Sequence, residues 1–468
     1  MTEINQFINQ EIEKVDKVKQ AQFSKNFDYI IDSNGQKINF NDSRIVFVDP
    51  EPRNPYGRQL VINLYKKYGL NIRISKETDA SVLQYAKKIC SGRECLASVA
   101  IAGAVLKDIH ECRTDEEITI YRTPIDQHGP CQNGAWPVLW ETFASRLNTK
   151  NVIFYAFPKY TNNYLGLNQD LIAWENINFL IGHYLIEARN ALYCVAENRD
   201  IAMERFERLT REFIKNVKEG KKTLNTGLLK WAKEVAKTPL KAKVEETPKV
   251  LIFGGLNLMF DHYPIEDFFL ERGIIAKVVD IAESMNLILA ESTIRFGFKK
   301  GITNPKEQFN EQVLEFYGVD EKERREAQRV KRNRSTMKFL NSQCKIFRKI
   351  IGKSGLLFDP YVDFIDLLEE GNNHISSNSF TETPIITGRF LYSIKEGIYD
   401  GLINLGTFNC QPAMNSQAII RPLANKSDIP YAAIDCEGPW ISTNQRRLLE
   451  TIAIQAIRVR KKKNIQVD

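Results

Sequence analysis

Apolar positions along the chain recur in two patterns, namely short β-branched runs and longer segments with helical spacing. The runs at 44–50, 70–75, 117–124 and 151–158 are compact and apolar, and turn-forming or polar residues bound them. These features are typical of buried strands. Segments with helical spacing follow these runs, and strands that alternate with helices predict a parallel, doubly wound sheet.

The same pattern returns in the second half of the chain. Apolar runs at 249–257, 275–281, 401–406 and 429–435 alternate with helical segments. A long helical insertion is predicted at 305–355. The fold class is therefore α/β, with two or more doubly wound parallel-sheet domains and helical insertions. We hypothesise that the two α/β halves have similar structures.

These patterns divide the chain into four predicted regions, and the helical region ends in the polar, Pro-bounded linker "KTPLKAKVEETP". The regions are a helical leader at 1–40, a first α/β domain at 41–164, a helical segment with its linker at 165–247, and a second α/β domain at 248–468.

Composition is that of an ordinary globular protein, with 43% hydrophobic and 26% charged residues among 468. The first 20 residues are polar and lack the apolar region of a signal peptide, and no apolar stretch reaches the roughly 18 residues of a membrane helix. We therefore expect a cytoplasmic protein without a membrane partner.

Net charge is +7, and basic residues concentrate in "KERREAQRVKRNRSTMK" and in "RVRKKK" near the end of the chain. Acidic residues are interspersed in the first run, so a solvated helix face is the favoured interpretation; an anionic cofactor tail or nucleic acid is the alternative. Stacking aromatics and Gly-rich loops are missing from both runs, which makes nucleic acid an unlikely partner.

Three of the eight cysteines share one local setting, a Gly- or Pro-marked turn just before a helix. Cys95 lies in "SGRECLA", Cys131 in "HGPCQNG" and Cys410 in "GTFNCQPAM". Helix N-termini favour thiolate, and iron–sulfur clusters require thiolate ligands. These three residues are the predicted metal- and cofactor-binding residues, with buried structural thiols as the alternative.

A zinc site fits less well, because the chain has no CxxC pair and no His at ligand spacing. Cys90 is a further candidate ligand, but it ends a helix and packing is the favoured interpretation. Cys436 is a candidate for lining the site without being a ligand. Cys344 and Cys194 fall on or beside apolar helical stripes and are predicted core residues. His128, alone in a turn, is interpreted as structural.

Other short motifs are weaker indications of a functional site. "IIGKSG" at 350–355 contains Gly-Lys-Ser, but the phosphate-loop pattern requires glycine at 347, where the chain has Phe. No nucleotide-hydrolysis site is therefore predicted. The glycines in "FGGLN" indicate a ligand-facing turn or close packing. Arg446 and Arg447 are either surface residues or contacts for an anion or cluster.

Four segments resemble the 2-hydroxyacyl-CoA dehydratase and benzoyl-CoA reductase superfamily, in its branch of activase-related and double-cubane-cluster proteins. They are "SGRECLASVAIAGAVLK", "IDQHGPCQNG", "INLGTFNCQPAMNSQAIIRPLA" and "DIPYAAIDCEGPWISTNQRRLLETIAIQA". The resemblance implies flavodoxin-like domains with an iron–sulfur cluster, [4Fe-4S] or double-cubane, held between them. Cys95, Cys131 and Cys410 carry over as its ligands.

The resemblance also implies a function. The chain is expected to be an enzyme of the oxidoreductase or dehydratase type and the electron-transfer component of an ATP-dependent system. A separate activator ATPase would deliver low-potential electrons, an acyl-CoA or another small molecule would accept them, and the chain would form a homo- or heterodimer. The alternative is a non-enzymatic two-lobed ligand binder or scaffold without metal.

Overall fold

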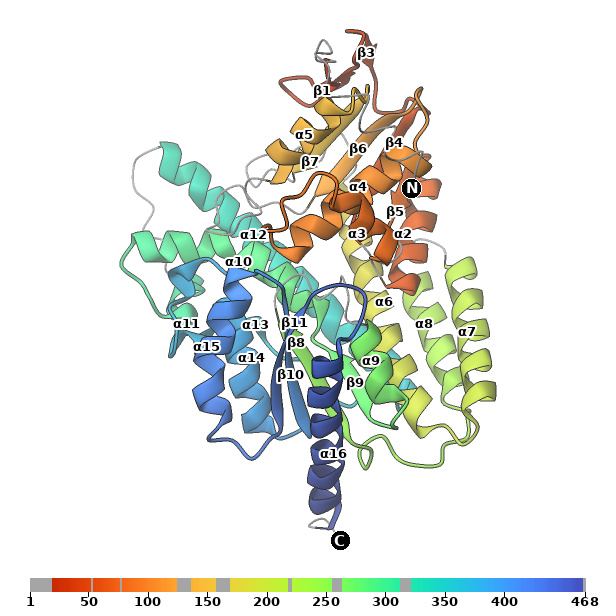
Figure 1. Ribbon diagram of the computed structural model, residues 1–468, viewed down its shortest axis with the longest axis vertical. Helices are drawn as coiled ribbons and strands as arrows, with labels where there is room; N and C mark the ends of the chain where they lie inside the picture. The colour runs from red at the N-terminus through yellow and green to blue at the C-terminus, as the bar shows by residue number, and fades with distance from the viewer. Residues whose placement is uncertain are drawn as a thin grey trace. The chain divides into compact units, whose positions relative to one another are not determined.

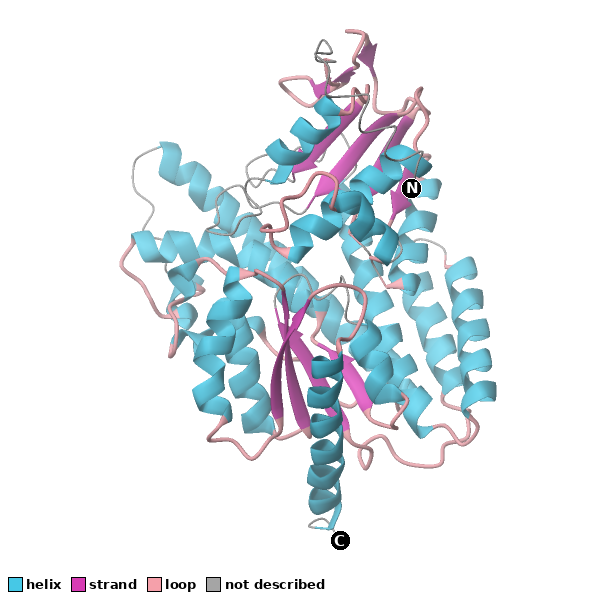
Figure 2. Cartoon of the chain, viewed as in Figure 1, coloured by secondary structure: helices cyan, strands magenta, loops and turns pink. Residues whose placement is uncertain are grey.

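The computed structural model describes residues 19–51, 54–75, 78–123, 136–156, 169–217, 221–254, 263–311 and 321–465 (Figures 1 and 2). The chain forms two compact units, each built around its own sheet. Unit 1 comprises residues 1–53 and 61–176, and unit 2 comprises residues 54–60 and 177–468.

The sheet of unit 1 has four parallel strands in the order β5-β4-β6-β7. Their apolar side chains are buried, with Phe47 and Ile120 fully enclosed, as expected of strands covered on both faces. The strands are β4 (Ile45–Asp49), β5 (Asn71–Ile74), β6 (Ile118–Thr123) and β7 (Val152–Ala156). The accompanying helices are α2 (Pro55–Lys67), α3 (Ala80–Ala86), α4 (Leu96–Glu111) and α5 (Trp136–Arg146).

The predicted helical leader is wrong for its described part. Residues 22–38 form a small antiparallel sheet of β1 (Gln22–Phe23), β2 (Ile30–Ile31) and β3 (Lys37–Ile38). The Asp32 carboxylate accepts hydrogen bonds from the backbone N–H groups of Asn34 and Gln36, and Gly35 has a positive φ of 84°. This turn chemistry forces a chain reversal, which a helix cannot accommodate.

The region after β7 is helical in its described part, as predicted. It consists of α6 (Gln169–Val195), α7 (Arg199–Asn216) and α8 (Lys221–Val235). The first turn of α2 packs on α6 within unit 2, where a Cβ on Gly182 would lie 2.3 Å from the Gly57 nitrogen. Only glycines permit this approach of two helix backbones.

The sheet of unit 2 repeats the topology of unit 1, with parallel strands in the order β11-β10-β8-β9. In both sheets the spatial order is second, first, third, fourth along the chain, which is a flavodoxin-like arrangement. The strands are β8 (Lys249–Gly254), β9 (Ile275–Val278), β10 (Gly401–Thr407) and β11 (Tyr431–Cys436). The predicted α/β fold with two doubly wound sheets is confirmed.

Helices flank this second sheet (Figure 2). They are α9 (Tyr263–Leu270), α10 (Ile281–Lys299), α11 (Pro305–Gln308), α12 (Glu321–Ile351), α13 (Phe364–Asn372), α14 (Thr383–Glu396), α15 (Gln411–Ala424) and α16 (Thr443–Ile465), with 3₁₀ turns η4 (Gly352–Ser354) and η5 (Ser377–Ser379). Two of these helices, α10 and α14, were not predicted. Because η4 follows the helix α12 rather than a strand, the Gly-Lys-Ser sequence there does not have the context of a phosphate loop.

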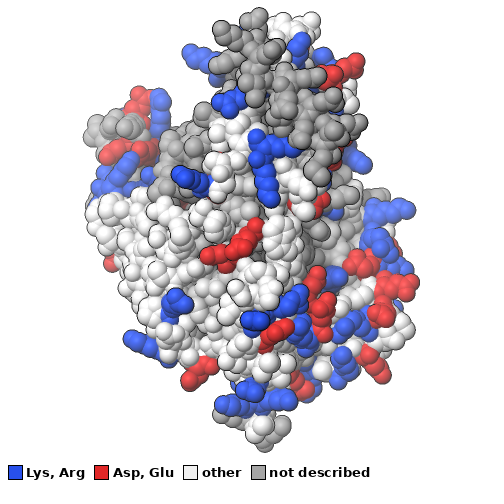
Figure 3. All heavy atoms as spheres, in the orientation of Figure 1, with Lys and Arg blue, Asp and Glu red and all other residues white. Residues whose placement is uncertain are grey.

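The basic run on α12 is largely a solvated, ion-paired surface. Exposed pairs join Arg325 to Glu321 and Lys338 to Glu311. Figure 3 shows Lys and Arg interspersed with Asp and Glu on the lower right of the visible face, and few charges on its left side. Within the part of the chain that the structure describes, no helix is both long and apolar enough to cross a membrane.

Candidate functional site

Each unit places a cysteine at the start of a helix that borders its sheet. Cys95 is the N-cap residue of α4 and Cys410 is that of α15, and neither side chain makes the capping hydrogen bond. Both residues are buried, with 4% and 6% of their surface exposed. Because crossover helices run antiparallel to parallel strands, these N-termini lie at the carboxyl edges of the sheets, where doubly wound folds bind ligands.

The Cys410 turn is a compact strand-to-helix connection. Its backbone N–H donates to the Thr407 carbonyl at 2.9 Å, and its carbonyl accepts from Met414 at 3.0 Å. Asn409 takes a left-handed conformation with φ of 60°, and Pro412 lies in the first turn of α15. The turn therefore fixes the Cys410 backbone between strand and helix, as the sequence predicts.

Cys436 lies beside this turn, at the end of the neighbouring strand. Thr407 and Cys436 are register partners in the β10–β11 ladder, and the Phe408 N–H donates to the Cys436 carbonyl at 3.0 Å. The Cys436 thiol donates to the Gly438 carbonyl at 3.4 Å. The structure thus brings the Cys436 and Cys410 segments together at one edge, consistent with the predicted lining role of Cys436.

A side-chain clamp holds the two cysteine segments in register. Gln417 of α15 donates to the Asp435 carboxylate at 2.8 Å, and Gln445 of α16 donates to the Asp435 carbonyl at 2.7 Å. Gly406 lies against the clamp, since a Cβ there would be 2.8 Å from the Ala413 Cβ and 2.9 Å from the Asp435 Oδ1. Glycine is therefore required at 406 for α15, β10 and β11 to approach this closely.

Buried polar atoms at this edge remain available. The Thr407 hydroxyl, on a residue only 9% exposed, has no hydrogen-bond partner among the described residues. An unpaired buried hydroxyl is costly unless another group, such as a water or a ligand, contacts it. The donors at this edge are two cysteine thiols and a helix N-terminus, which is the chemistry that a thiophilic metal centre uses.

The Cys95 turn has its own internal cap. The Glu94 carboxylate accepts from the N–H groups of Ser91 and Gly92, and Gly92 has a φ of 82°. Burial, together with the negative charge of Glu94, raises the pKa of Cys90 to about 12. Cys90 is therefore a thiol near neutral pH in the metal-free protein.

Several predicted positions lie outside the described residues, namely Cys131, His128 and the glycine at 255 in "FGGLN". Within the described ranges, no group of three or more His, Cys, Asp or Glu residues is placed to hold a metal ion. Cys194 and Cys344 are buried, as predicted for core residues, and burial raises the pKa of both thiols.

A buried ionic network in unit 2 was not predicted from the sequence. Lys277 of β9 donates to Glu187 at 2.6 Å and to Asp359 at 2.8 Å, and Arg348 of α12 pairs with the same two carboxylates. Burial raises the pKa of Asp359, but Lys277 and Arg348 outweigh it and lower that pKa overall. The available signal was a lysine inside the apolar run "IAKVV" and a glutamate inside an apolar helix.

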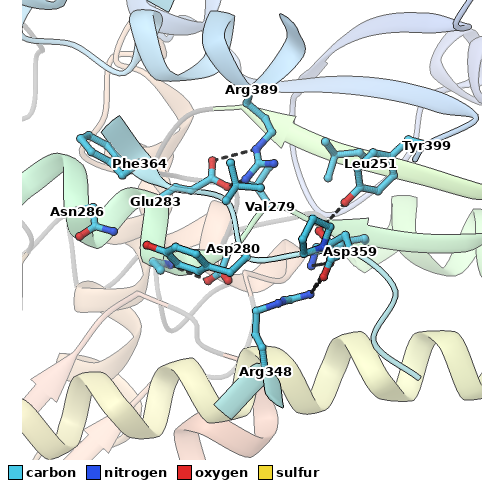
Figure 4. Close-up of a pocket in the computed structure, with 15 residues that line it drawn as sticks. Leu251, Val279, Asp280, Glu283, Asn286, Arg348, Asp359, Phe364, Arg389 and Tyr399 are labelled. Atoms are coloured by element: carbon cyan, nitrogen blue, oxygen red, sulfur yellow. Dashed lines mark hydrogen bonds and ion pairs between the residues drawn. The ribbon is translucent and has the colours of Figure 1, made fainter. Parts of the chain in front are cut away.

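This network borders a small pocket (Figure 4). Arg389 reaches into it from α14, where it pairs with Glu283, and Arg348 reaches in from α12. Asp280 caps α10 through the Ala282 N–H and accepts from the Tyr184 hydroxyl at 2.7 Å. A second pocket at the carboxyl end of β8 shares Glu283 and Arg389 with the first. Each pocket has room for only about one water molecule.

Unit 1 has a smaller buried network near the carboxyl ends of β4 and β6. Arg122 donates to the Tyr65 hydroxyl at 2.7 Å and to Glu175 at 2.9 Å, and lies 3.5 Å from Asp49. Burial disfavours the charged guanidinium, but Glu175, Tyr65 and Asp49 raise the pKa of Arg122 overall. Internal ion pairs therefore occupy the described carboxyl ends of β4 and β6. This is the place where the strand order reverses and where doubly wound folds bind ligands.

Comparison with known proteins identifies no family for this chain. The sequence matches no protein-family model and no curated protein.

Proposed function

We propose that this chain is the iron–sulfur electron-transfer component of an ATP-dependent reductase or 2-hydroxyacyl-CoA dehydratase-like system. It would receive low-potential electrons from a separate activator ATPase and reduce a small substrate. The observation that supports this proposal most is the repeated placement of Cys95 and Cys410 as buried N-cap residues at the carboxyl edges of two sheets with one topology.

The proposed ligands are Cys95, Cys131 and Cys410. An iron–sulfur cluster supplies one-electron transfer at low potential when bound. The protein's part is to present thiolates, which the partial positive charge of a helix N-terminus favours. The clamp of Gln417 and Asp435 would hold the Cys410 backbone in place during electron transfer.

Anaerobic purification tests the proposal directly. We expect a brown protein with about four or more iron atoms and a similar amount of acid-labile sulfide per chain. Cys95→Ala and Cys410→Ala should each lower the iron content. Cys344→Ala is the matched control, because this buried thiol lies in the α12 core and should lose packing but keep iron. A colourless, iron-free protein after anaerobic reconstitution would instead support the metal-free ligand binder.

The energy source is tested separately. The isolated chain should show no ATP hydrolysis above background, because Gly352–Ser354 lacks the strand-to-helix context of a phosphate loop. ATP-dependent reduction should appear only after addition of an activator ATPase. Robust hydrolysis by the chain alone would contradict the assignment of electron delivery to a separate ATPase.

A further inference from the structure

The final helix, α16, packs on unit 2 along one face only. Its buried residues are Leu449, Ile452, Ala453 and Ala456. Beyond Ala456 none of its described residues is buried, and polar contacts hold the helix instead. Arg460 Nε donates to the Asp400 carboxylate at 2.8 Å, and Lys463 Nζ donates to its other oxygen at 2.9 Å. Figure 1 shows this end of α16 projecting beyond the strands of its sheet.

The opposite face of α16 carries a stripe of cations and isoleucines, which we call the basic stripe. Its members are Arg447, Ile454, Arg458, Lys461, Lys462 and Ile465. They recur at intervals of three, four and seven residues, which places them along one side of a helix. All six are exposed, and the four cations form no ion pair with any described residue.

The positive charge of the basic stripe is not balanced on its own helix. Glu450 is the only acidic residue of α16. Exposed cations on α12 are, by contrast, paired with carboxylates, as in Arg325 with Glu321. Figure 3 shows Lys and Arg gathered at the lower end of the visible face, where Figure 1 places the end of α16. Unpaired cations on one helix face attract an anionic partner.

The two isoleucines distinguish between anionic partners. Ile454 and Ile465 are 54% and 75% exposed and lie among the cations of the stripe. A nucleic acid backbone would contact the cations through its phosphates but would bury little of either isoleucine. The surface of an anionic bilayer provides headgroups for the cations and an apolar layer for the isoleucines. Long Lys and Arg side chains reach headgroups from a helix whose apolar side chains enter that layer.

We propose that the exposed face of α16 binds the surface of an anionic lipid bilayer. The four cations of the basic stripe would contact lipid headgroups, and its two isoleucines would enter the boundary between headgroups and acyl chains. Such contact is peripheral and requires no membrane-spanning helix. It differs from the sequence-based expectation of no membrane partner, which considered spanning and signal segments alone. It is also independent of the electron-transfer function proposed above.

Cosedimentation of the full-length chain with lipid vesicles tests this proposal. Vesicles of phosphatidylserine and phosphatidylcholine in equal parts should bind the chain at low salt, and pure phosphatidylcholine should not. Each Lys or Arg near an anionic surface contributes about 1 kcal/mol, so Lys461→Gln/Lys462→Gln should weaken binding about 30-fold. Ile454→Ser/Ile465→Ser should weaken binding without changing its salt dependence, because salt screens charges and not apolar contacts.

The matched control is Lys331→Gln/Lys349→Gln, which removes two exposed lysines of α12 and should leave vesicle binding unchanged. Absence of binding to the anionic vesicles, or equal binding to both kinds of vesicle, would overturn the proposal. Duplex DNA is the third probe. Binding to DNA that is as tight as to anionic vesicles and insensitive to the isoleucine variant would assign the stripe to nucleic acid, which would overturn the proposal as well.

Discussion

The two units share a strand order but differ in the chemistry of their carboxyl edges. At the described carboxyl ends of β4 and β6 in unit 1, Arg122 is paired with the buried carboxylates of Asp49 and Glu175. In unit 2, the ends of β10 and β11 carry two cysteines, an unpaired hydroxyl and exposed rings. The comparison teaches that topology determines where a site can form, and that side chains decide whether the position is filled or available.

The largest expected effect comes from removing Arg122, which pairs with both carboxylates of the unit 1 network. Arg122→Met leaves Asp49 and Glu175 buried without it and should lower the free energy of unfolding by about 3–5 kcal/mol. Lys277→Met in unit 2 should cost less, because Arg348 still pairs with Glu187 and Asp359. Urea unfolding of both variants measures this difference, and a larger loss for Lys277→Met would contradict our description of the two networks.

A pH-sensitive residue, His183, lies close enough to the unit 2 network for the charges of Lys277 and Arg348 to act on it. Its Nε2 is buried without a hydrogen-bond partner among the described residues, and burial lowers the pKa of His183 to about 4 from an ordinary 6.5. The folded state therefore binds fewer protons than the unfolded state, and stability falls as the pH drops from about 6.5 towards 4.

Between pH 7.5 and 5, the free energy of unfolding should fall by about 2 kcal/mol through this one group. Chemical denaturation at the two pH values measures the loss, and His183→Gln should abolish most of it. If the variant keeps the full pH dependence, another group is responsible.

A smaller effect is expected at the unit 2 edge itself. Gly406→Ala places a methyl group against Ala413 and Asp435 and should destabilise the fold by about 1–2 kcal/mol. Because the clamp holds the Cys410 turn, the same variant should speed alkylation of Cys410, measured by mass spectrometry. Gly69→Ala is a control for glycine replacement in general, since its Cβ would meet nothing within 4 Å, although its φ of 70° adds backbone strain. Unchanged alkylation in Gly406→Ala would show that the clamp does not restrain the turn.

The smallest effect is expected on the surface of α12. Arg325→Met removes an ion pair whose side chains are about three-quarters exposed, 76% for Arg325 and 74% for Glu321, and should change stability by less than about 0.5 kcal/mol. Thermal unfolding of Arg325→Met and Arg122→Met, measured under the same conditions, compares the loss of stability at the surface with the loss at the buried network. A comparable loss in the two variants would mean that burial does not distinguish the networks from the surface pairs.

Much of the fold was predictable because parallel strands covered on both faces appear as continuous apolar runs. The eight strands of the two sheets were found in this way. The helix α14 was missed because its start, "TPIIT", is β-branched and resembles a strand. The strands β1–β3 were missed because two-residue strands have no periodicity to detect.

The site was predictable only in part. The Gly and Pro residues around Cys95 and Cys410 located two helix starts, because turn chemistry is local. The pairing of Thr407 with Cys436 depends on strand register, and the network of Glu187 with Lys277 joins residues 90 positions apart. Such long-range contacts depend on the completed fold and leave no short-range pattern.

The clamp over Gly406 also gives the molecule a built-in optical reporter. Asp435 is tied to α15 by Gln417 and to α16 by Gln445, and Trp440 lies in the short connection between Asp435 and Gln445. The Cys436 thiol bonds to the carbonyl of Gly438, over which the indole lies. Alkylation or metallation of a thiol at this edge should therefore change the emission of an indole that is already half exposed to water. The chain needs no attached dye for its thiol chemistry to be followed by fluorescence in real time.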